Sequence, residues 1–239
     1  MIEIKNVSKN YDGIHNVVDN LSLTIPTGTV FGFLGPNGAG KTTTIKMLVG
    51  INKPDSGEIN INKKQPTLTT TREAISFMPE EPHFYDQLTG LEFLEFSVSL
   101  FGKNKQSKIN LGEILKKTGI YEARDAKIKT YSKGMKQRLG FAQALVNNPD
   151  YIFLDEPLDG LDPIGRRDLK LAIENLKMEG KTIFFNSHIL ADVEILCDQI
   201  GIIHRGQLIY SGSVNEFKKS KSLEDQFVET IKKLENNSE

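Results

Sequence analysis

Two short apolar runs mark the chain, from Val30 to Leu34 and from Tyr151 to Leu154. Uninterrupted apolar runs of this length are typical of strands that are buried on both faces of a parallel sheet. A glycine-rich segment follows the first run, and two acidic residues follow the second. Because ligands of parallel sheets bind where the strands end, the pattern predicts a binding site at the carboxyl ends of these two strands.

The spacing of apolar residues changes along the chain. Residues 1–83 are strand-like around the glycine-rich segment, and an alternating segment from Glu58 to Asn62 follows a turn. Residues 84–147 differ, because Leu91, Leu94 and Val98 recur at helical spacing. From residue 148 onward, strand-like and helix-like segments alternate, which predicts a parallel α/β core.

Local signals place the later elements. Pro163 stands at the first position of a predicted helix, behind Asp162, and Gly180 ends that helix. Residues 200–212 predict two short strands, and the tail from Leu223 is amphipathic.

The glycine-rich segment predicts a phosphate-binding loop. Its residues, extended by one into the following helix, are Gly35, Pro36, Asn37, Gly38, Ala39, Gly40, Lys41, Thr42 and Thr43. Small and turn-forming residues let successive backbone N–H groups point at an anion, and the following helix adds the positive end of its dipole. Lys41 can then reach the β- and γ-phosphates, and the Thr42 hydroxyl can hold Mg²⁺. The strand-loop-helix context favours this interpretation over a structural turn.

The acidic pair Asp155 and Glu156 has two predicted roles. Asp155 suits Mg²⁺, bound through water, as the second acidic element of P-loop NTPases does. Glu156 is expected to face the attacking water, from which its carboxylate takes a proton as the general base. Without the upstream loop, a solvated turn would be the simpler interpretation of an Asp-Glu pair.

With these motifs the chain resembles the ATP-binding subunit of ABC transporters, and the resemblance covers nearly all of it. Besides the phosphate loop and the acidic pair, the matching positions are Tyr11, Glu80 after Phe77-Met78-Pro79, the signature-like Ser132-Lys133-Gly134-Met135, Asp159-Gly160-Leu161-Asp162, and His188. The resemblance implies an α/β fold: a P-loop NTPase core of the ABC type, with an N-terminal antiparallel β subdomain and an inserted α-helical subdomain. It implies one nucleotide-binding domain over 1–239, with the core at 1–83 and 148–212, the helical subdomain at 84–147 and a helical tail at 213–239.

The resemblance also implies roles for these residues. Tyr11 stacks on the adenine of ATP, and Glu80 touches Mg²⁺ and the attacking water. Ser132 and Gly134 close on the γ-phosphate that a second chain holds, and His188 contacts the γ-phosphate in its own chain. Lys41, Glu156 and His188 are therefore the expected catalytic residues, with Thr42, Glu80 and Asp155 at the metal.

The residues support these roles independently, with two departures from the family pattern. Ser132 precedes apolar residues at helical spacing and is a natural N-cap. His188 follows a β-rich run, with Ser187 placed to cap the next helix. The first departure is Glu80, which replaces a glutamine of the family. The second is in the signature, where Lys133 and Met135 replace a small residue and an amide residue.

Charge and composition limit the kinds of binding partner and compartment that can be expected. The 239 residues carry a net charge of −1, so no global basic field points to nucleic acid. The lysines at 218–221 predict a solvated surface. The single cysteine, Cys197, is expected on an apolar helix face with Leu190 and Val193, as a small core residue, and it agrees with a reducing compartment. No signal peptide is expected at Met1, and no apolar run approaches the ~18 residues of a membrane span.

The expected partners are therefore a transmembrane permease on a separate chain and a second nucleotide-binding domain. ATP and Mg²⁺ are the expected cofactors, and the cytoplasmic face of the membrane is the expected location. ATP hydrolysis would drive transport, and by analogy with the exporter-type subfamily this would be export. Two alternatives stay open: a soluble ABC-family ATPase that acts on ribosomes or nucleic acid, and a nucleotide-gated scaffold without turnover.

Overall fold

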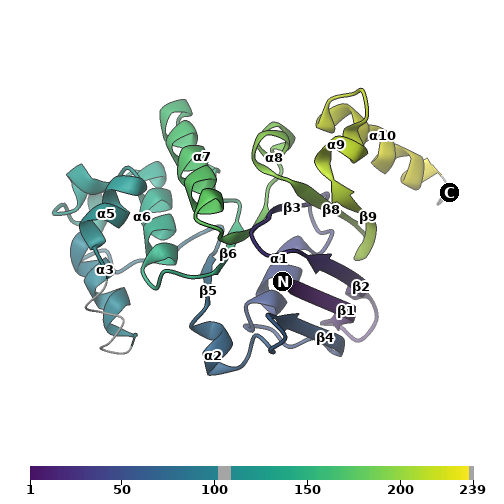
Figure 1. Ribbon diagram of the computed structural model, residues 1–239, viewed down its shortest axis with the longest axis horizontal. Helices are drawn as coiled ribbons and strands as arrows, with labels where there is room; N and C mark the ends of the chain where they lie inside the picture. Colours follow the sequence, from purple (N-terminus) through teal and green to yellow (C-terminus); the bar gives the residue numbers. More distant parts are fainter. Residues whose placement is uncertain (102–108, 237–239) are drawn as a thin grey trace.

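The computed structural model describes residues 1–101 and 109–236, and its strands form two sheets (Figure 1). The smaller sheet has the order β2-β1-β4 and is antiparallel. The larger sheet has the order β5-β6-β7-β3-β8-β9, in which only the β8-β9 pair is antiparallel. The strands are β1 (Ile2–Asn10), β2 (Asn16–Ile25), β3 (Val30–Leu34), β4 (Ser56–Ile61), β5 (Ile75–Met78), β6 (Tyr151–Asp155), β7 (Thr182–Asn186), β8 (Gln199–His204) and β9 (Gln207–Ser213).

Helices lie on both faces of the larger sheet and at its ends. They are α1 (Lys41–Leu48), α2 (Thr69–Arg72), α3 (Gly90–Ser99), α5 (Leu111–Lys117), α6 (Lys133–Leu145), α7 (Pro163–Met178), α8 (Leu190–Leu196), α9 (Val214–Lys218) and α10 (Leu223–Asn236). Two short 3₁₀ helices, Tyr121–Ala123 and Ile128–Thr130, connect α5 to α6. Among the described residues, no helix is long and apolar enough to cross a membrane. The expected α/β fold class is confirmed.

The alternation of side chains along a strand builds two cores, one on each face of the larger sheet. In β6, Tyr151 and Phe153 pack with the smaller sheet and α1, whereas Ile152 and Leu154 pack with α7 and α8. Every residue of β6 is buried, as the apolar run predicts. Because β6 is covered on both faces, only its carboxyl end can present polar groups to a ligand.

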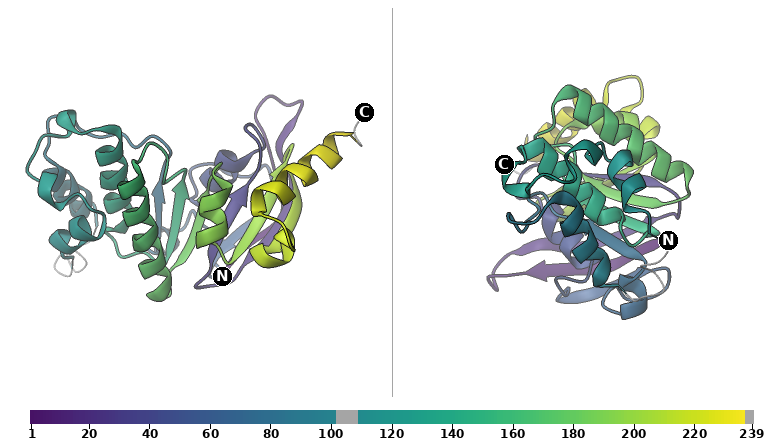
Figure 2. Two further views of the ribbon diagram at one scale, coloured as in Figure 1. Left: turned by 90° about the horizontal axis from the view of Figure 1, so that it is seen from above. Right: turned by 90° about the vertical axis from the view of Figure 1, so that its left-hand side faces the viewer.

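The helical region has a core of its own. Phe93, Leu94 and Val98 of α3 pack against Leu115 of α5 and Leu139 of α6, which confirms the predicted helical spacing. Residues 102–108 of this region, like 237–239 of the tail, lie outside the described residues. This region and the tail stand at opposite ends of the molecule (Figures 1 and 2).

Local signals fix the remaining elements, with two corrections. Pro163 begins α7, and Asp162 caps it by accepting from the Gly165 N–H at 2.9 Å. Ser187, however, does not cap α8: its hydroxyl accepts from the Ile189 N–H, and Ile189 is the cap residue. Cys197 follows α8 rather than lying within it, and it packs against the core.

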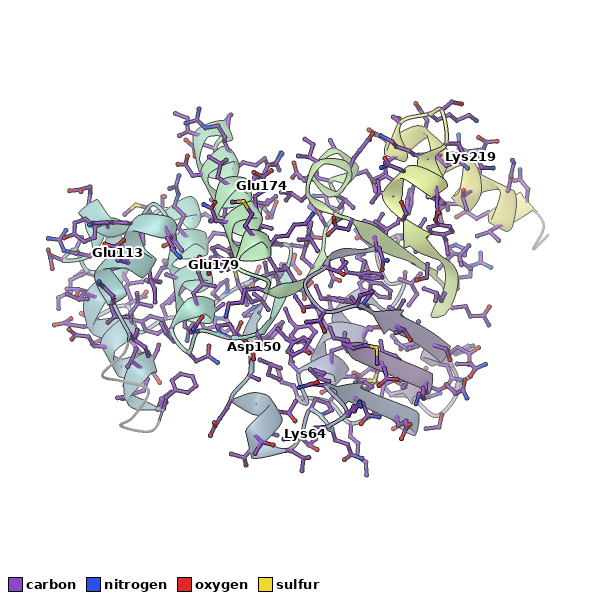
Figure 3. The ribbon with its side chains drawn as sticks, in the orientation of Figure 1. Lys64, Glu113, Asp150, Glu174, Glu179 and Lys219 are labelled. Atoms are coloured by element: carbon purple, nitrogen blue, oxygen red, sulfur yellow. The ribbon has the colours of Figure 1, made fainter. Side chains whose placement is uncertain are left out.

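The amphipathic tail forms α10, which packs against α8 and α9 through Leu223 and Ile231. Lys219 lies on the connection between α9 and α10, at the outer end of the molecule, and is exposed, as expected for a solvated surface (Figure 3).

Candidate functional site

The candidate site lies where four parallel strands, β5, β6, β7 and β3, end side by side. The register pairs Asp155 of β6 with Asn186 of β7, and Asn186 in turn with Phe33 of β3. The glycine-rich loop leaves β3 two residues after Phe33, and His188 follows β7. The sheet therefore brings the predicted loop, acidic pair and histidine to one edge.

The loop from β3 to α1 requires glycine at two positions. A Cβ at Gly35 would lie 2.3 Å from the Ile203 carbonyl oxygen, so the backbone passes too close to β8 for any side chain. Gly40, the N-cap of α1, has φ 108°, a conformation that other residues rarely adopt. The first turn of α1 then begins with Lys41, so its free N–H groups face the space that the loop encloses.

Lys41 folds back over its own loop. Its Nζ donates to the carbonyl oxygens of Gly35 at 2.7 Å and Pro36 at 3.1 Å. Burial lowers the pKa of Lys41, while the nearby carboxylates of Glu156, Asp155 and Glu80 raise it. The ammonium thus lies within electrostatic reach of all three carboxylates, and a bound phosphate can take over the two carbonyl contacts without the lysine leaving the site.

Asp155 is buried and held by a partner that the sequence did not reveal. Its Oδ1 accepts from Asn186 Nδ2 at 2.8 Å, and Asp155 is only 3% exposed. Asn186 Oδ1 is buried without a hydrogen-bond partner among the described residues. No local pattern indicates this contact, because it depends on the register between β6 and β7.

Glu156 and His188 form a direct pair. Glu156 Oε2 lies 2.8 Å from His188 Nδ1 and accepts from the His188 backbone N–H at 3.2 Å. Burial raises the pKa of Glu156, and His188 and Lys41 partly oppose this rise. Glu156 has φ 50°, an uncommon conformation for a residue with a side chain, and Gln137 Nε2 donates to its carbonyl oxygen at 3.0 Å. The carboxylate is thereby fixed at the end of β6.

The signature-like segment lies apart from the loop. Ser132 Oγ accepts from the Met135 N–H at 3.2 Å, which confirms it as the N-cap of α6. Lys133 Nζ binds Asp159 Oδ2 at 2.7 Å. Ser132 is exposed, and within residues 1–101 and 109–236 no hydrogen bond or ion pair joins Ser132 or Gly134 to the loop.

Two further predicted residues flank the site. Glu80 follows β5, is exposed, and is close enough to Lys41 to raise its pKa. Tyr11, between β1 and β2, is 59% exposed, and its hydroxyl accepts from Asn52 Nδ2 at 2.6 Å. Asn52 follows α1, so the tyrosine hydroxyl is bound to the segment beyond the carboxyl end of that helix.

Comparison with known proteins identifies the family. The family model described as ABC transporter matches residues 18–159. The chain belongs to the ABC transporter family. An uncharacterised ABC transporter ATP-binding protein of Synechocystis is 46% identical over 203 residues, or 82% of this chain. The chain spans 56% of the length of that relative, little more than half.

Two other members of the ABC transporter family match along most of their own length. The lantibiotic transport ATP-binding protein SrtF of Streptococcus pyogenes is 38% identical over 95% of this chain and 96% of its own. A dimeric ATP-binding cassette, solved in a post-hydrolysis state with ADP and Pi, has a TM-score of 0.80 and 25% identity over 90% of this chain and 99% of its own.

Proposed function

We propose that this chain is the ATP-binding and ATP-hydrolysing subunit of an ABC transporter. The observation that supports this most is the convergence of Lys41, Asp155 and the Glu156–His188 pair on one sheet edge, in a chain of this family. The loop N–H groups and Lys41 bind the phosphates, and Tyr11 contributes the adenine contact after leaving Asn52.

The residues at the edge fit a magnesium ion. Thr42, Asp155 and Glu80 offer the hydroxyl and carboxylate oxygens that Mg²⁺ prefers, and the orphaned Asn186 oxygen leaves a buried acceptor beside Asp155. When bound, Mg²⁺ neutralises charge on the phosphates. The three carboxylates near Lys41 repel the phosphates of a nucleotide, and a bound cation would offset this repulsion.

Glu156 takes the proton from the attacking water. Its raised pKa makes it a stronger base than an ordinary carboxylate, and His188 holds Oε2 so that the other oxygen faces outward. His188 is itself 54% exposed, which leaves its second ring nitrogen available to the γ-phosphate.

Ser132 and Gly134 serve a second copy of the cassette. Ser132 is exposed at the start of α6, and no hydrogen bond among the described residues joins it or Gly134 to the loop of their own chain, so we assign both to the γ-phosphate of ATP held by a partner cassette. The structural relative with ADP and Pi is dimeric, which supports this assignment. Loss of the γ-phosphate removes charge-assisted contacts from the interface, so the two cassettes separate after hydrolysis.

The separation of the two cassettes would act on a transmembrane permease, which is a separate chain, at the cytoplasmic face of the membrane. The relatives named as transport ATP-binding proteins support this partner, and export is the direction we propose. The test is ATP hydrolysis by the chain alone and in complex with its permease, in Mg²⁺ and in EDTA. We expect Mg²⁺-dependent hydrolysis; its absence from both preparations would refute the proposal.

A further inference from the structure

Helices α7 and α8 each continue from a segment that carries one half of the candidate catalytic pair. Residues 157–162 connect Glu156 to α7, and the Asp159 N–H donates to the Glu156 carbonyl oxygen at 3.2 Å. Residues 187–189 connect β7 to α8 and include His188. Both helices lie on the same face of the larger sheet (Figure 1), where they share one hydrophobic core.

A group of three charged side chains joins the two helices, and we call it the Asp192 cluster: Asp192 of α8 with Arg166 and Lys170 of α7. Lys170 Nζ lies 2.6 Å from Asp192 Oδ1, and the Asp192 side chain is only 3% exposed. Arg166 Nε lies 3.6 Å from Asp192 Oδ2, beyond hydrogen-bond length. Both of these atoms are buried, and among the described residues neither has a hydrogen-bond partner. Asp192 therefore makes one tight and one loose contact with α7.

The cluster closes a ring of contacts through the candidate active site. Starting at Glu156, the chain passes residues 157–162 into α7, whose start is fixed by the Asp162 cap. Arg166 and Lys170 then join α7 to Asp192, whose N–H donates to the Ile189 carbonyl oxygen at 3.1 Å. One residue earlier, His188 returns to Glu156 Oε2.

The charged contacts can fix the position of α8 relative to α7 more sharply than the apolar packing beside them. Burial of apolar surface is non-directional, so the helices could slide over their shared core with little change in buried area. A buried ion pair depends strongly on distance and leaves two uncompensated charges when it is broken. The Lys170–Asp192 contact thus defines where α8 begins relative to α7.

We propose that Asp192 is a positioning residue, which acts through Lys170 and Arg166 to hold His188 against Glu156. This inference rests on the proposed ATP hydrolysis and concerns the same site. Because Asp192 binds Lys170 and Arg166 rather than the loop, its loss should lower the rate of the chemical step and leave the phosphate loop unchanged.

The test compares Asp192→Asn, Lys170→Met and the double variant with the wild type. Glu194→Gln is the matched control, because Glu194 lies on the same helix but binds Lys218 and the Leu223 N–H of the tail. The measurements are kcat, KM for ATP, the affinity for ATP and the melting temperature, on the chain in complex with its permease.

We expect each single variant to lower kcat by about tenfold to a hundredfold, because small displacements of catalytic groups have effects of this size. The affinity for ATP should stay within about twofold, since the loop is intact. The double variant should be no slower than the slower single variant, since both substitutions break one contact. Glu194→Gln should keep the wild-type kcat.

Unchanged kcat in a folded Asp192→Asn protein would overturn the inference, as would a parallel loss of kcat and ATP affinity. Multiplying effects in the double variant would also overturn it. If Asp192→Asn does not fold, Lys170→Met supplies the same comparison, because Asp192 then keeps Arg166. A wild type without hydrolysis would instead refute the proposed function itself, and with it this inference.

Discussion

The edge of the larger sheet and the start of α6 differ in how much of a site they hold within one chain. At the sheet edge, the carboxylates of Asp155, Glu156 and Glu80 lie close enough to Lys41 to raise its pKa, and Glu156 is bound to His188. At the start of α6, Ser132 is exposed and its hydroxyl serves its own helix as a cap. The first region gathers the candidate phosphate and metal ligands within one chain. The second region is the solvent-exposed start of a helix.

The difference lies in which contacts each region can make alone. Parallel strands bring distant residues together at one edge, so the sheet assembles the first region from four segments of the same chain. The helical region has its own core and attaches its helix start beside Asp159 rather than beside the loop. We infer that the first region binds ATP and the second recognises ATP that is already bound to another copy.

The largest expected effect is that of Lys41→Ala, which should abolish hydrolysis and weaken ATP binding. Loss of a charge-assisted contact costs about 1.5 to 3 kcal/mol in binding, before any loss in the transition state. Lys46→Ala, on the same helix but outside the loop, is the control and should bind ATP like the wild type. Equilibrium binding of a fluorescent ATP analogue checks both variants. Wild-type turnover in Lys41→Ala would refute the role of the loop.

The next largest effect is that of Glu156→Gln, which should bind ATP but turn it over about 10²- to 10⁴-fold more slowly than the wild type. Glutamine keeps the size of the side chain and one acceptor oxygen, but it cannot take a proton from water. Glu174→Gln, an exposed change on α7, is the control (Figure 3). Steady-state hydrolysis and ATP binding are measured on each protein. Substantial turnover in Glu156→Gln would assign the general base elsewhere.

Much of the sheet edge could be predicted from the sequence because its signals are local. The apolar runs predict β3 and β6, and strand ends carry the ligand groups. Likewise Asp162 and Pro163 predict the start of α7, and Ser132 that of α6. Each of these signals involves residues a few positions apart, whose effect on the backbone does not depend on distant packing.

The contacts that escaped prediction join segments far apart in the sequence. Asn186 binds Asp155 only because β6 and β7 pair in one register. Tyr11 rests on Asn52, which no spacing rule indicates. Such pairs depend on strand register and packing, which a local pattern does not contain.

A smaller effect is expected for His188→Ala, which removes the partner of the Glu156 carboxylate. We expect kcat to fall at least about tenfold, because Glu156 loses the contact that orients it. His188 also lowers the pKa of Glu156, so its removal should raise that pKa. Glu156 must be ionised to act as a base, so the acid limb of the rate profile should move to higher pH. A pH–rate profile that keeps its shape and position would contradict this role.

The smallest effect is expected for Glu80→Gln. An amide oxygen can still contact the metal or its water, so hydrolysis should persist within about tenfold of the wild type. The concentration of Mg²⁺ that gives half-maximal rate should change, because a carboxylate near the γ-phosphate is lost. Glu80→Ala should instead uncouple hydrolysis from the permease. If both variants hydrolyse and couple like the wild type, Glu80 has no role at the metal.

The most direct test of the difference between the two regions is the association state of Glu156→Gln with MgATP, measured by gel filtration with light scattering. This variant should form a dimer that needs ATP. Adding Ser132→Arg should abolish the dimer and leave the affinity of each chain for ATP largely unchanged, because the arginine stands at the start of α6 and not in the loop. The same pair of variants is compared in complex with the permease. A Glu156→Gln protein that stays monomeric in both preparations, or a double variant that still dimerises, would contradict a site shared between two chains.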